Sequence, residues 1–173
     1  MALLEILKYP DKFLKHTATP VEEINDDILQ LIDDMAETMY DEPGVGLAAT
    51  QVGWDERLIV YDVSANQESR QYDVLINPEI LSHEGVFVTE KEGCLSVPDF
   101  KANVKRFASV TVSGLNRKGK PVRLEAQDMM AAVFQHEIDH LNGILFIEHI
   151  SGLKRDMYKR RIKKQLRKKA KKK

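Results

Sequence analysis

Apolar positions near the start of the chain recur at helical spacing. Within residues 26–41 they fall on one face of a 3.6-residue turn, at Ile28, Leu31, Ile32, Met35 and Met39. Asn25 stands where a helix N-cap is expected, and the sequence EPGVG ends the pattern. The spacing therefore predicts an amphipathic helix over residues 26–41.

The pattern then changes to short β-branched runs separated by glycine, proline and asparagine, which is typical of β-strands. The runs are RLIVYDV (57–63), DVLINPEIL (73–81), GVFVTEKEG (85–93), VKRFASVTVSGLN (104–116) and KPVRLEA (120–126). The sequence NRKGK at 116–120 is typical of a hairpin turn. Several short strands in succession predict antiparallel or mixed β-sheets.

Helical spacing returns over residues 128–142, and Gly143 stands in the position of a helix C-cap. The apolar sequence ILFIEHI (144–150) is expected to be extended, and Ser151 to cap a last helix. We therefore expect an α+β fold with β-sheets around a central helix. Residues 1–150 would form its main body, and 151–173 a C-terminal helix that extends the same domain.

Composition fits a globular protein of one domain, because 173 residues suffice for one core and are few for two. No apolar run approaches the roughly 18 residues of a membrane span, and the first residues do not resemble a signal peptide. The lone cysteine, Cys94, fits a reducing compartment. These features predict a cytoplasmic protein that does not enter membranes.

Charge is divided unevenly along the chain. Residues 151–173 hold thirteen Lys and Arg and one acid, a net charge of +12, while the other 150 residues hold 13 bases and 26 acids, a net charge of −13. Tyr158, Ile162 and Leu166 form a narrow apolar stripe in this basic segment, and Leu153 and Met157 are expected to anchor its start. A dense cationic helix suits phosphate backbones, although a solubilising tail is the simpler alternative.

The predicted second helix carries the sequence HEIDH. His136 and His140 lie four residues apart, so both imidazoles project from one helical face. Glu137 lies about 100° around the helix, where it can reach a water molecule at a metal held by the two histidines. The pattern supplies two metal ligands and a general base, unless it is an ordinary solvated helical face.

A third ligand is needed for a catalytic metal site. In one large class of metallopeptidases the third ligand is a histidine three residues after the glycine of the motif HExxHxxGxxH. Here Gly143 fits that glycine, but Phe146 occupies the histidine position and cannot bind a metal. Cys94 in EGCLSVP is the remaining candidate, and one cysteine with two histidines leaves a fourth position for water. A thiolate favours Fe(II), Zn(II), Co(II) or Ni(II) over magnesium or calcium.

The glycine-rich sequence PGVGLAATQVG at 43–53 lacks the features of a phosphate-binding loop. Its small residues would instead allow the backbone of an extended substrate to approach closely. Gln51 would then place an amide donor near the reacting carbonyl group.

Three of these segments in this order, GVGLAATQ, EGCLS and HEIDH, closely resemble the signature motifs of the peptide deformylases. The resemblance runs from YPD near the start to GILFIEHI. It implies an α+β hydrolase that removes the formyl group from the N-terminal formylmethionine of nascent polypeptides and releases formate. Residues 1–150 would be the catalytic part.

The resemblance also implies roles for individual residues. Cys94, His136 and His140 would bind one divalent metal ion, Fe(II) in the cell, with Zn, Ni or Co able to replace it. Glu137 would be the acid–base group, and Gln51 with the backbone N–H of Leu95 would stabilise the oxyanion. The backbones of three further residues would pair with the substrate peptide: Val45, Gly46 and Gly93.

Residues seven, four and three before His136 lie on its side of the helix: Met129, Ala132 and Val133. They could form an apolar pocket for the methionine side chain, or they could be plain core. Asp139 could orient an imidazole or bond to a surface Arg or Lys, with the structural role favoured. From the resemblance, Glu92 and Arg106 could form an ion pair beside Cys94.

Members of this family with a similar C-terminal extension use it to dock on the ribosome, so we expect the basic helix to contact rRNA or protein near the exit tunnel. Two alternatives stay open. One is a metallopeptidase of the HExxH type, which Phe146 disfavours. The other is a ribosome- or RNA-binding module with a structural metal, which would want a fourth protein ligand. We expect a monomer.

Overall fold

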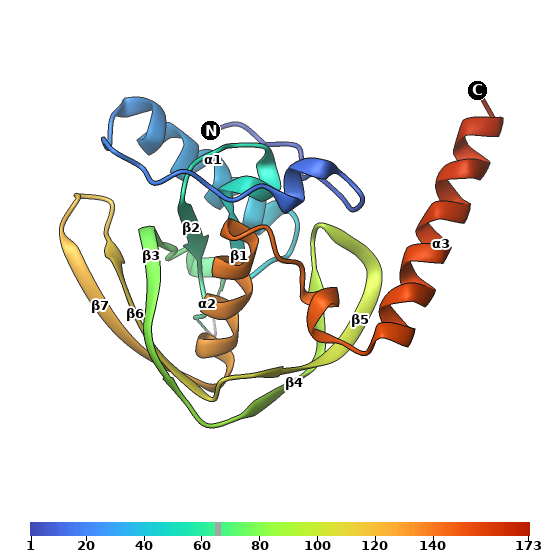
Figure 1. The fold of residues 1–173 in the computed structure, drawn as a ribbon. Helices are drawn as coiled ribbons and strands as arrows, with labels where there is room; N and C mark the ends of the chain where they lie inside the picture. Colours follow the sequence, from blue (N-terminus) through green and yellow to red (C-terminus); the bar gives the residue numbers. More distant parts are fainter. Residues whose placement is uncertain (65–66) are drawn as a thin grey trace.

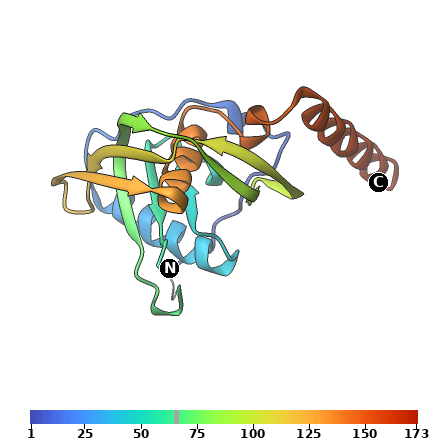
Figure 2. The same ribbon diagram turned by 90° about the horizontal axis from the view of Figure 1, so that it is seen from below.

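The computed structural model describes residues 1–64 and 67–173. A central helix, α2 (Asp128–Leu141), is surrounded by β-sheets, and a last helix, α3 (Gly152–Lys171), projects from the body (Figures 1 and 2). The predicted α+β fold with β-sheets around a central helix is therefore confirmed.

The larger sheet is antiparallel, with the strand order β1–β2–β3–β6–β7. Its strands are β1 (Gly46–Ala48), β2 (Leu58–Tyr61), β3 (Asp73–Glu84), β6 (Ser109–Leu115) and β7 (Pro121–Gln127). A second antiparallel pair, β4 (Phe87–Cys94) and β5 (Val97–Arg106), lies on the other side of α2 (Figure 1). The very short strand β1 forms one edge of the larger sheet, beside the central helix.

Helix α1 (Asp26–Asp41) begins and ends where the sequence predicts. The side chain of Asn25 caps it by accepting a hydrogen bond from the N–H of Ile28. The apolar face of α1 packs on β1 and β2, and Met35 and Met39 are fully buried there. This packing stabilises the short edge strand that faces the site.

Helix α2 packs into a second apolar cluster, where Phe134 meets Tyr61 edge-on with ring centroids 4.9 Å apart. Gly143 follows its C-terminus with φ +73°, and a Cβ there would lie 2.3 Å from the carbonyl oxygen of Lys15. Only glycine fits both the left-handed conformation and this close contact. The predicted end of the helix is thus confirmed.

The run 104–116, predicted as one strand, is two strands in different sheets. The chain leaves β5 after Arg106 because the side chain of Gln135 on α2 forms hydrogen bonds with the backbone of Phe107, in place of a neighbouring strand. The N–H of Phe107 donates to Gln135 Oε1, and Gln135 Nε2 donates to the carbonyl of Phe107. The predicted hairpin turn at 116–120 is confirmed, since the N–H of Asn116 donates to the carbonyl of Lys120.

Two short segments also differ from the prediction. The segment 144–150 is not extended, because Phe146–His149 forms a 3₁₀ turn. The carboxylate of Glu148 holds this turn by accepting from the N–H of Leu145. The glycine-rich stretch 43–53 is more ordered than a loop, since it contains β1 and a 3₁₀ turn at Ala49–Val52. Two further 3₁₀ turns cover Lys12–Lys15 and Gln67–Ser69.

Two of the three residues of the predicted apolar stripe attach the start of α3 to the body, and the third, Leu166, is 45% exposed. Ser151 caps the helix as expected, and Tyr158 and Ile162 are 2% and 7% exposed in a third apolar cluster with Phe146. The anchoring expected from two other residues is wrong, since both are largely exposed: Leu153 and Met157. Burial of the stripe contributes roughly 1.5–3 kcal/mol per large apolar side chain. No helix in the described ranges, 1–64 and 67–173, has the length and apolar character needed to cross a membrane.

Candidate active site

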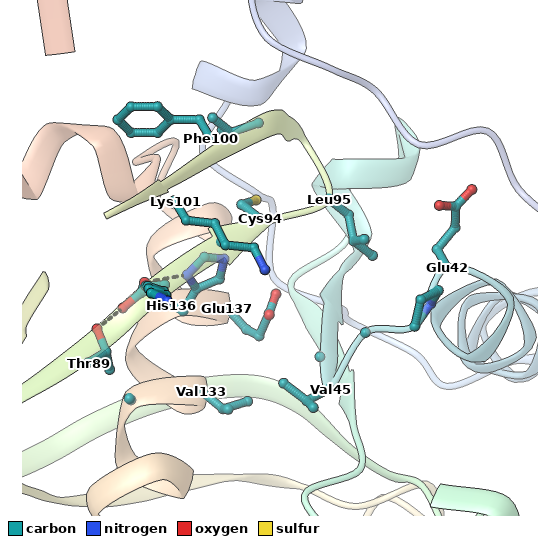
Figure 3. Close-up of a pocket in the computed structure, with 18 of the residues that line it drawn as sticks. Glu42, Val45, Thr89, Cys94, Leu95, Phe100, Lys101, Val133, His136 and Glu137 are labelled. Atoms are coloured by element: carbon teal, nitrogen blue, oxygen red, sulfur yellow. Dashed lines mark hydrogen bonds and ion pairs between the residues drawn. The ribbon is translucent and has the colours of Figure 1, made fainter. Parts of the chain in front are cut away.

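A cleft of about 840 Å³ opens between α2, β1 and the β4–β5 pair (Figure 3). One face of α2 forms its floor, and the start of β1 and the turn between β4 and β5 form its two walls. Eleven of the twelve residues that the sequence assigns to the site line it: Val45, Gly46, Gln51, Gly93, Cys94, Leu95, Met129, Ala132, Val133, His136 and Glu137. The structure therefore brings together segments that lie far apart in the sequence.

The twelfth residue, His140, lies one helical turn below His136 and is 1% exposed. Its Nε2 is 3.2 Å from His136 Nε2 and 3.2 Å from Cys94 Sγ. The three donor atoms lie within 4.8 Å of one another. Ligands at usual zinc bond lengths and tetrahedral angles would be about 3.3 Å (N to N) and about 3.6 Å (S to N) apart. The donor set therefore fits one shared divalent ion with little adjustment.

Glu92 fixes the orientation of the His136 ring. Its carboxylate lies 2.7 Å from His136 Nδ1, so this nitrogen donates its proton and Nε2 keeps a lone pair toward the other donors. Burial raises the pKa of Glu92, but hydrogen bonds from His136 and Arg106 outweigh it and lower the pKa to about 2. Burial also holds the pKa of His140 well below its usual value, which keeps this imidazole neutral and able to act as a donor.

Arg106 connects the β4 side of the site to the α2 side. Its side chain is 3% exposed, and it contacts Glu92 on β4 and Asp139 on α2 with N–O distances of 2.5 and 2.8 Å. The ion pair expected between Glu92 and Arg106 is confirmed. Asp139 has the expected structural role, but its arginine partner is buried instead of lying on the surface. Asp139 also contacts His149.

Glu137 is 4% exposed and lines the cleft beside the donor set (Figure 3). Its Oε2 has no hydrogen-bond partner among the described residues. Burial raises the pKa of this carboxyl to about 7, although neighbouring His136 opposes the shift. A Cβ on Gly46 would lie 2.6 Å from Glu137 Oε1, so a side chain at that position would displace the carboxylate.

Gln51 is held with its amide nitrogen toward the cysteine. Its Oε1 accepts from the N–H of Ala48, which leaves Nε2 3.2 Å from Ser96 Oγ and 3.7 Å from Cys94 Sγ. The side chain is fixed on the 3₁₀ turn that follows β1 and is 2% exposed. A donor in such a fixed position suits a reacting oxygen that gains negative charge.

The free edge of β1 faces the cleft. Val45 accepts from the N–H of Asp62, so these two form a hydrogen-bonded pair of the antiparallel ladder. The next pair, Gly46 with Tyr61, must then point its backbone groups away from the ladder. Gly46 therefore presents N–H and C=O toward the cleft, while the carbonyl of Val45 is occupied inside the sheet.

Gly93 stands on the opposite wall, where a Cβ would meet only the aliphatic chain of Lys101 at 3.5 Å or more. The floor residues Ala132 and Val133 are 3% and 6% exposed, and Met129 is 58% exposed at the rim. All three residues line the cleft, and their role in binding a methionine side chain stays a prediction.

Sequence reasoning missed the contact between Glu92 and His136, and the lining residues Glu42 and Phe100 (Figure 3). The sequence contained a signal for Glu92, because a carboxylate two residues before a ligand cysteine can reach the same site. No comparable pattern marked Glu42 or Phe100.

Comparisons with known proteins agree with this geometry. The family model for "Polypeptide deformylase" matches residues 3–156. A peptide deformylase from Thermodesulfovibrio yellowstonii is 52% identical over 163 residues, which are 94% of this chain and 98% of the relative. The crystal structure of a peptide deformylase from Legionella pneumophila superposes with a TM-score of 0.88 at 44% identity and covers 98% of both chains.

A second similar structure is a peptide deformylase from Acinetobacter baumannii with Met-Ala-Ser bound. It has a TM-score of 0.81 and 38% identity, and the match covers 86% of this chain and 99% of that chain. The site geometry, the matched family model and these relatives lead to one conclusion: the chain belongs to the polypeptide deformylase family.

Proposed function

We propose that this chain deformylates nascent peptides in the cleft described above, with Cys94, His136 and His140 holding one divalent metal ion. The observation that carries the proposal is the buried Glu137, whose Oε2 lacks a partner among the described residues beside three converging donor atoms. A buried, unpaired carboxylate is costly to stability, and such groups are typical of catalytic sites.

The bound ion would supply Lewis-acid chemistry and lower the pKa of a water molecule in the cleft. Glu137 then accepts a proton from this water molecule while the oxygen of the water attacks the formyl carbon. The oxyanion that forms receives hydrogen bonds from Gln51 Nε2 and the backbone N–H of Leu95. When the C–N bond breaks, Glu137 gives the proton to the amine nitrogen, and formate and the free N-terminus leave.

The substrate peptide would bind as an added strand in the gap between β1 and the β4–β5 pair. Gly46 offers N–H and C=O on one side, and Gly93 faces it from the other. Val45, which is 46% exposed at the mouth, is also proposed to pair with the peptide through its backbone, but not through its carbonyl, which bonds to Asp62. In this pose the N-terminal formyl amide would lie at the donor set.

The methionine side chain would lie on the floor of the cleft, against Ala132 and Val133 with Met129 at the rim. These residues offer apolar surface on the same helix as the metal ligands. A tryptophan at position 132 would fill this space. We expect Ala132→Trp to raise the KM for formylmethionyl peptides, and an unchanged KM would remove Ala132 from the pocket.

Fe(II) is our proposal for the ion in the cell, with Zn, Ni or Co able to replace it. One thiolate and two imidazoles suit all four of these ions, so occupancy depends on supply as well as affinity. An iron-loaded site would lose activity in air through oxidation of the ion or of Cys94. Metal analysis after anaerobic purification tests this proposal.

Formate release from formyl-Met-Ala-Ser, measured with and without a chelator, tests the proposed function. We expect release to stop when the chelator removes the ion and to return when Fe(II) or Ni(II) is added back. Release that persists in the metal-free chain would contradict the metal-dependent reaction. A peptidase assay on an unformylated peptide serves as the control and should show no cleavage, because buried Phe146 replaces the third peptidase ligand.

A second proposal concerns α3, which we expect to contact the ribosome near the exit tunnel in a monomeric, cytoplasmic enzyme. The helix carries its cations on an exposed surface that projects from the catalytic part, residues 1–150 (Figure 2). Truncation after Ser151 would remove Tyr158 and Ile162 from the core, so substitution of outer cations is the cleaner test.

A further inference from the structure

A row of hydrogen-bonded side chains leads from His136 to the surface. His136 Nδ1 contacts Glu92, Arg106 joins Glu92 to Asp139, and His149 Nε2 lies 2.8 Å from Asp139 Oδ2. We propose that His149 is a positioning residue of the metal centre, which acts through Asp139 and Arg106 on the orientation of His136. The proposal rests on the assignment of Cys94, His136 and His140 as the metal donors.

In each hydrogen bond of the row, only one partner can be the donor. Arg106 has only donors, so Asp139 and Glu92 accept from it as carboxylates. Asp139 Oδ2 therefore also accepts from His149, whose Nε2 must carry the proton. Glu92 accepts from His136 in the same way. Because every link is a donor–acceptor pair with a fixed direction, loss of the outermost donor leaves the next carboxylate incompletely paired.

Exposure is lowest at the middle of the row and highest at its outer end. The exposed fractions of the side chains, in order along the row, are 11%, 10%, 3%, 21% and 36% for His136, Glu92, Arg106, Asp139 and His149. His149 and Arg106 share one oxygen of Asp139, so the imidazole covers the side of the ion pair that faces solvent. Without this ring, water reaches Asp139 Oδ2 and competes for the bond to Arg106.

The position of His149 in the fold explains why it reaches this carboxylate. It is the last residue of the 3₁₀ turn Phe146–His149, whose first residue is buried under the same site. Asp139 is the neighbour of His140 on α2. Movement of Asp139 therefore affects both helix ligands, one through the chain and the other through Arg106 and Glu92.

The test is the rate at which the zinc-loaded full-length protein loses its metal to an excess of chelator. Groups that hold ligands from outside the coordination sphere typically change metal affinity about 10–100-fold. His149 stands further out, so we expect His149→Ala to release zinc about tenfold faster. His149→Gln keeps an N–H donor at similar reach, and its rate should stay within about twofold of the unmodified chain.

His16→Ala is the matched control, because His16 Nε2 lies 2.7 Å from Asp55 on a comparably exposed surface and has no contact with the row. Its zinc release should be unchanged. Equal release by His149→Ala and His16→Ala would overturn the inference and leave the metal centre intact. Equally fast release by His149→Gln and His149→Ala would also overturn it. An unmodified chain that holds no zinc would overturn both the inference and the donor assignment.

Discussion

Helices α2 and α3 follow one another in the chain, yet they use their side chains in opposite ways. Most of α2 is buried, and its polar residues Gln135, Glu137 and His140 are each less than 7% exposed. In α3 only Tyr158 and Ile162 are buried, and nearly all other residues face solvent. In α2 the buried polar side chains converge on one cleft, whereas α3 presents charge to solvent along most of its length.

This difference predicts how each helix responds to substitution. Chemistry on α2 depends on positions within fractions of an ångström, so single atoms should matter. Binding through α3 depends on the number of cations, so single changes should have small, additive effects that salt weakens. The predictions below compare the two helices, starting with the largest expected effect.

Glu137→Gln should lower the kcat of formate release by about 10²–10⁴-fold, because the amide cannot transfer the proton. The substitution keeps the size of the side chain, and Glu137 is not one of the three metal donors, so metal content should be unchanged. Formate release and metal analysis on the same preparation check both points. Near-normal turnover in this variant would refute the acid–base role.

Acid should destabilise the metal-free chain through Glu92. The folded pKa of about 2 lies below the unfolded value of 4.5, so the added stability is present above pH 4.5 and is lost as pH falls toward 2. The shift corresponds to about 3 kcal/mol, or roughly 300-fold in the unfolding constant. Urea unfolding of Glu92→Gln and the unmodified chain should differ most near neutral pH and converge near pH 2.

Gly46→Ala should reduce kcat/KM about 10–100-fold, since a misplaced reacting group can cost as much as 10²-fold. The new Cβ would overlap the carboxylate of Glu137 and occupy the open edge of β1. Gly152→Ala is the control, because Gly152 does not line the cleft and its Cβ would lie 3.7 Å from the side chain of Arg155. Similar losses in the two variants would show that Gly46 has no special role.

Replacement of Lys163, Lys164 and Arg167 by glutamine should have the smallest effect on chemistry, within about twofold for formyl-Met-Ala-Ser, because surface substitutions rarely disturb the fold. The same variant should bind ribosomes less tightly at low salt. The slope of log affinity against log salt should fall by up to about 2–3, or nearly one per lost phosphate contact. Unchanged co-sedimentation would contradict the docking proposal.

Patterns within one element were readable from the sequence. Helices α1 and α2 and the turn at 116–120 follow from local spacing, and two of the metal donors follow from helical periodicity around Glu137. Features set by distant partners were not readable. The break after β5 depends on Gln135, which is 28 residues from Phe107. The orientation of His136 depends on Glu92, which is 44 residues away.

Strand β1 escaped prediction for a related reason. Its three residues carry no alternation, and they are extended only because β2 pairs with them and α1 packs over them. Position 46 also shows why the spacing of residues alone is not enough. It requires glycine because a Cβ there would overlap the carboxylate of Glu137 on α2. Cys94 could be proposed as the third donor because few other candidates existed, and the resemblance to a family supported it.

The brevity of β1 has a consequence for turnover and for solubility. An open edge of three residues offers few main-chain contacts, so a peptide bound there would be held weakly and would leave soon after losing its formyl group. A longer open edge would bind products more firmly and would also invite strands of neighbouring molecules to pair with it. A short edge would therefore bind each new peptide briefly and would offer neighbouring molecules little backbone to pair with in an aggregate.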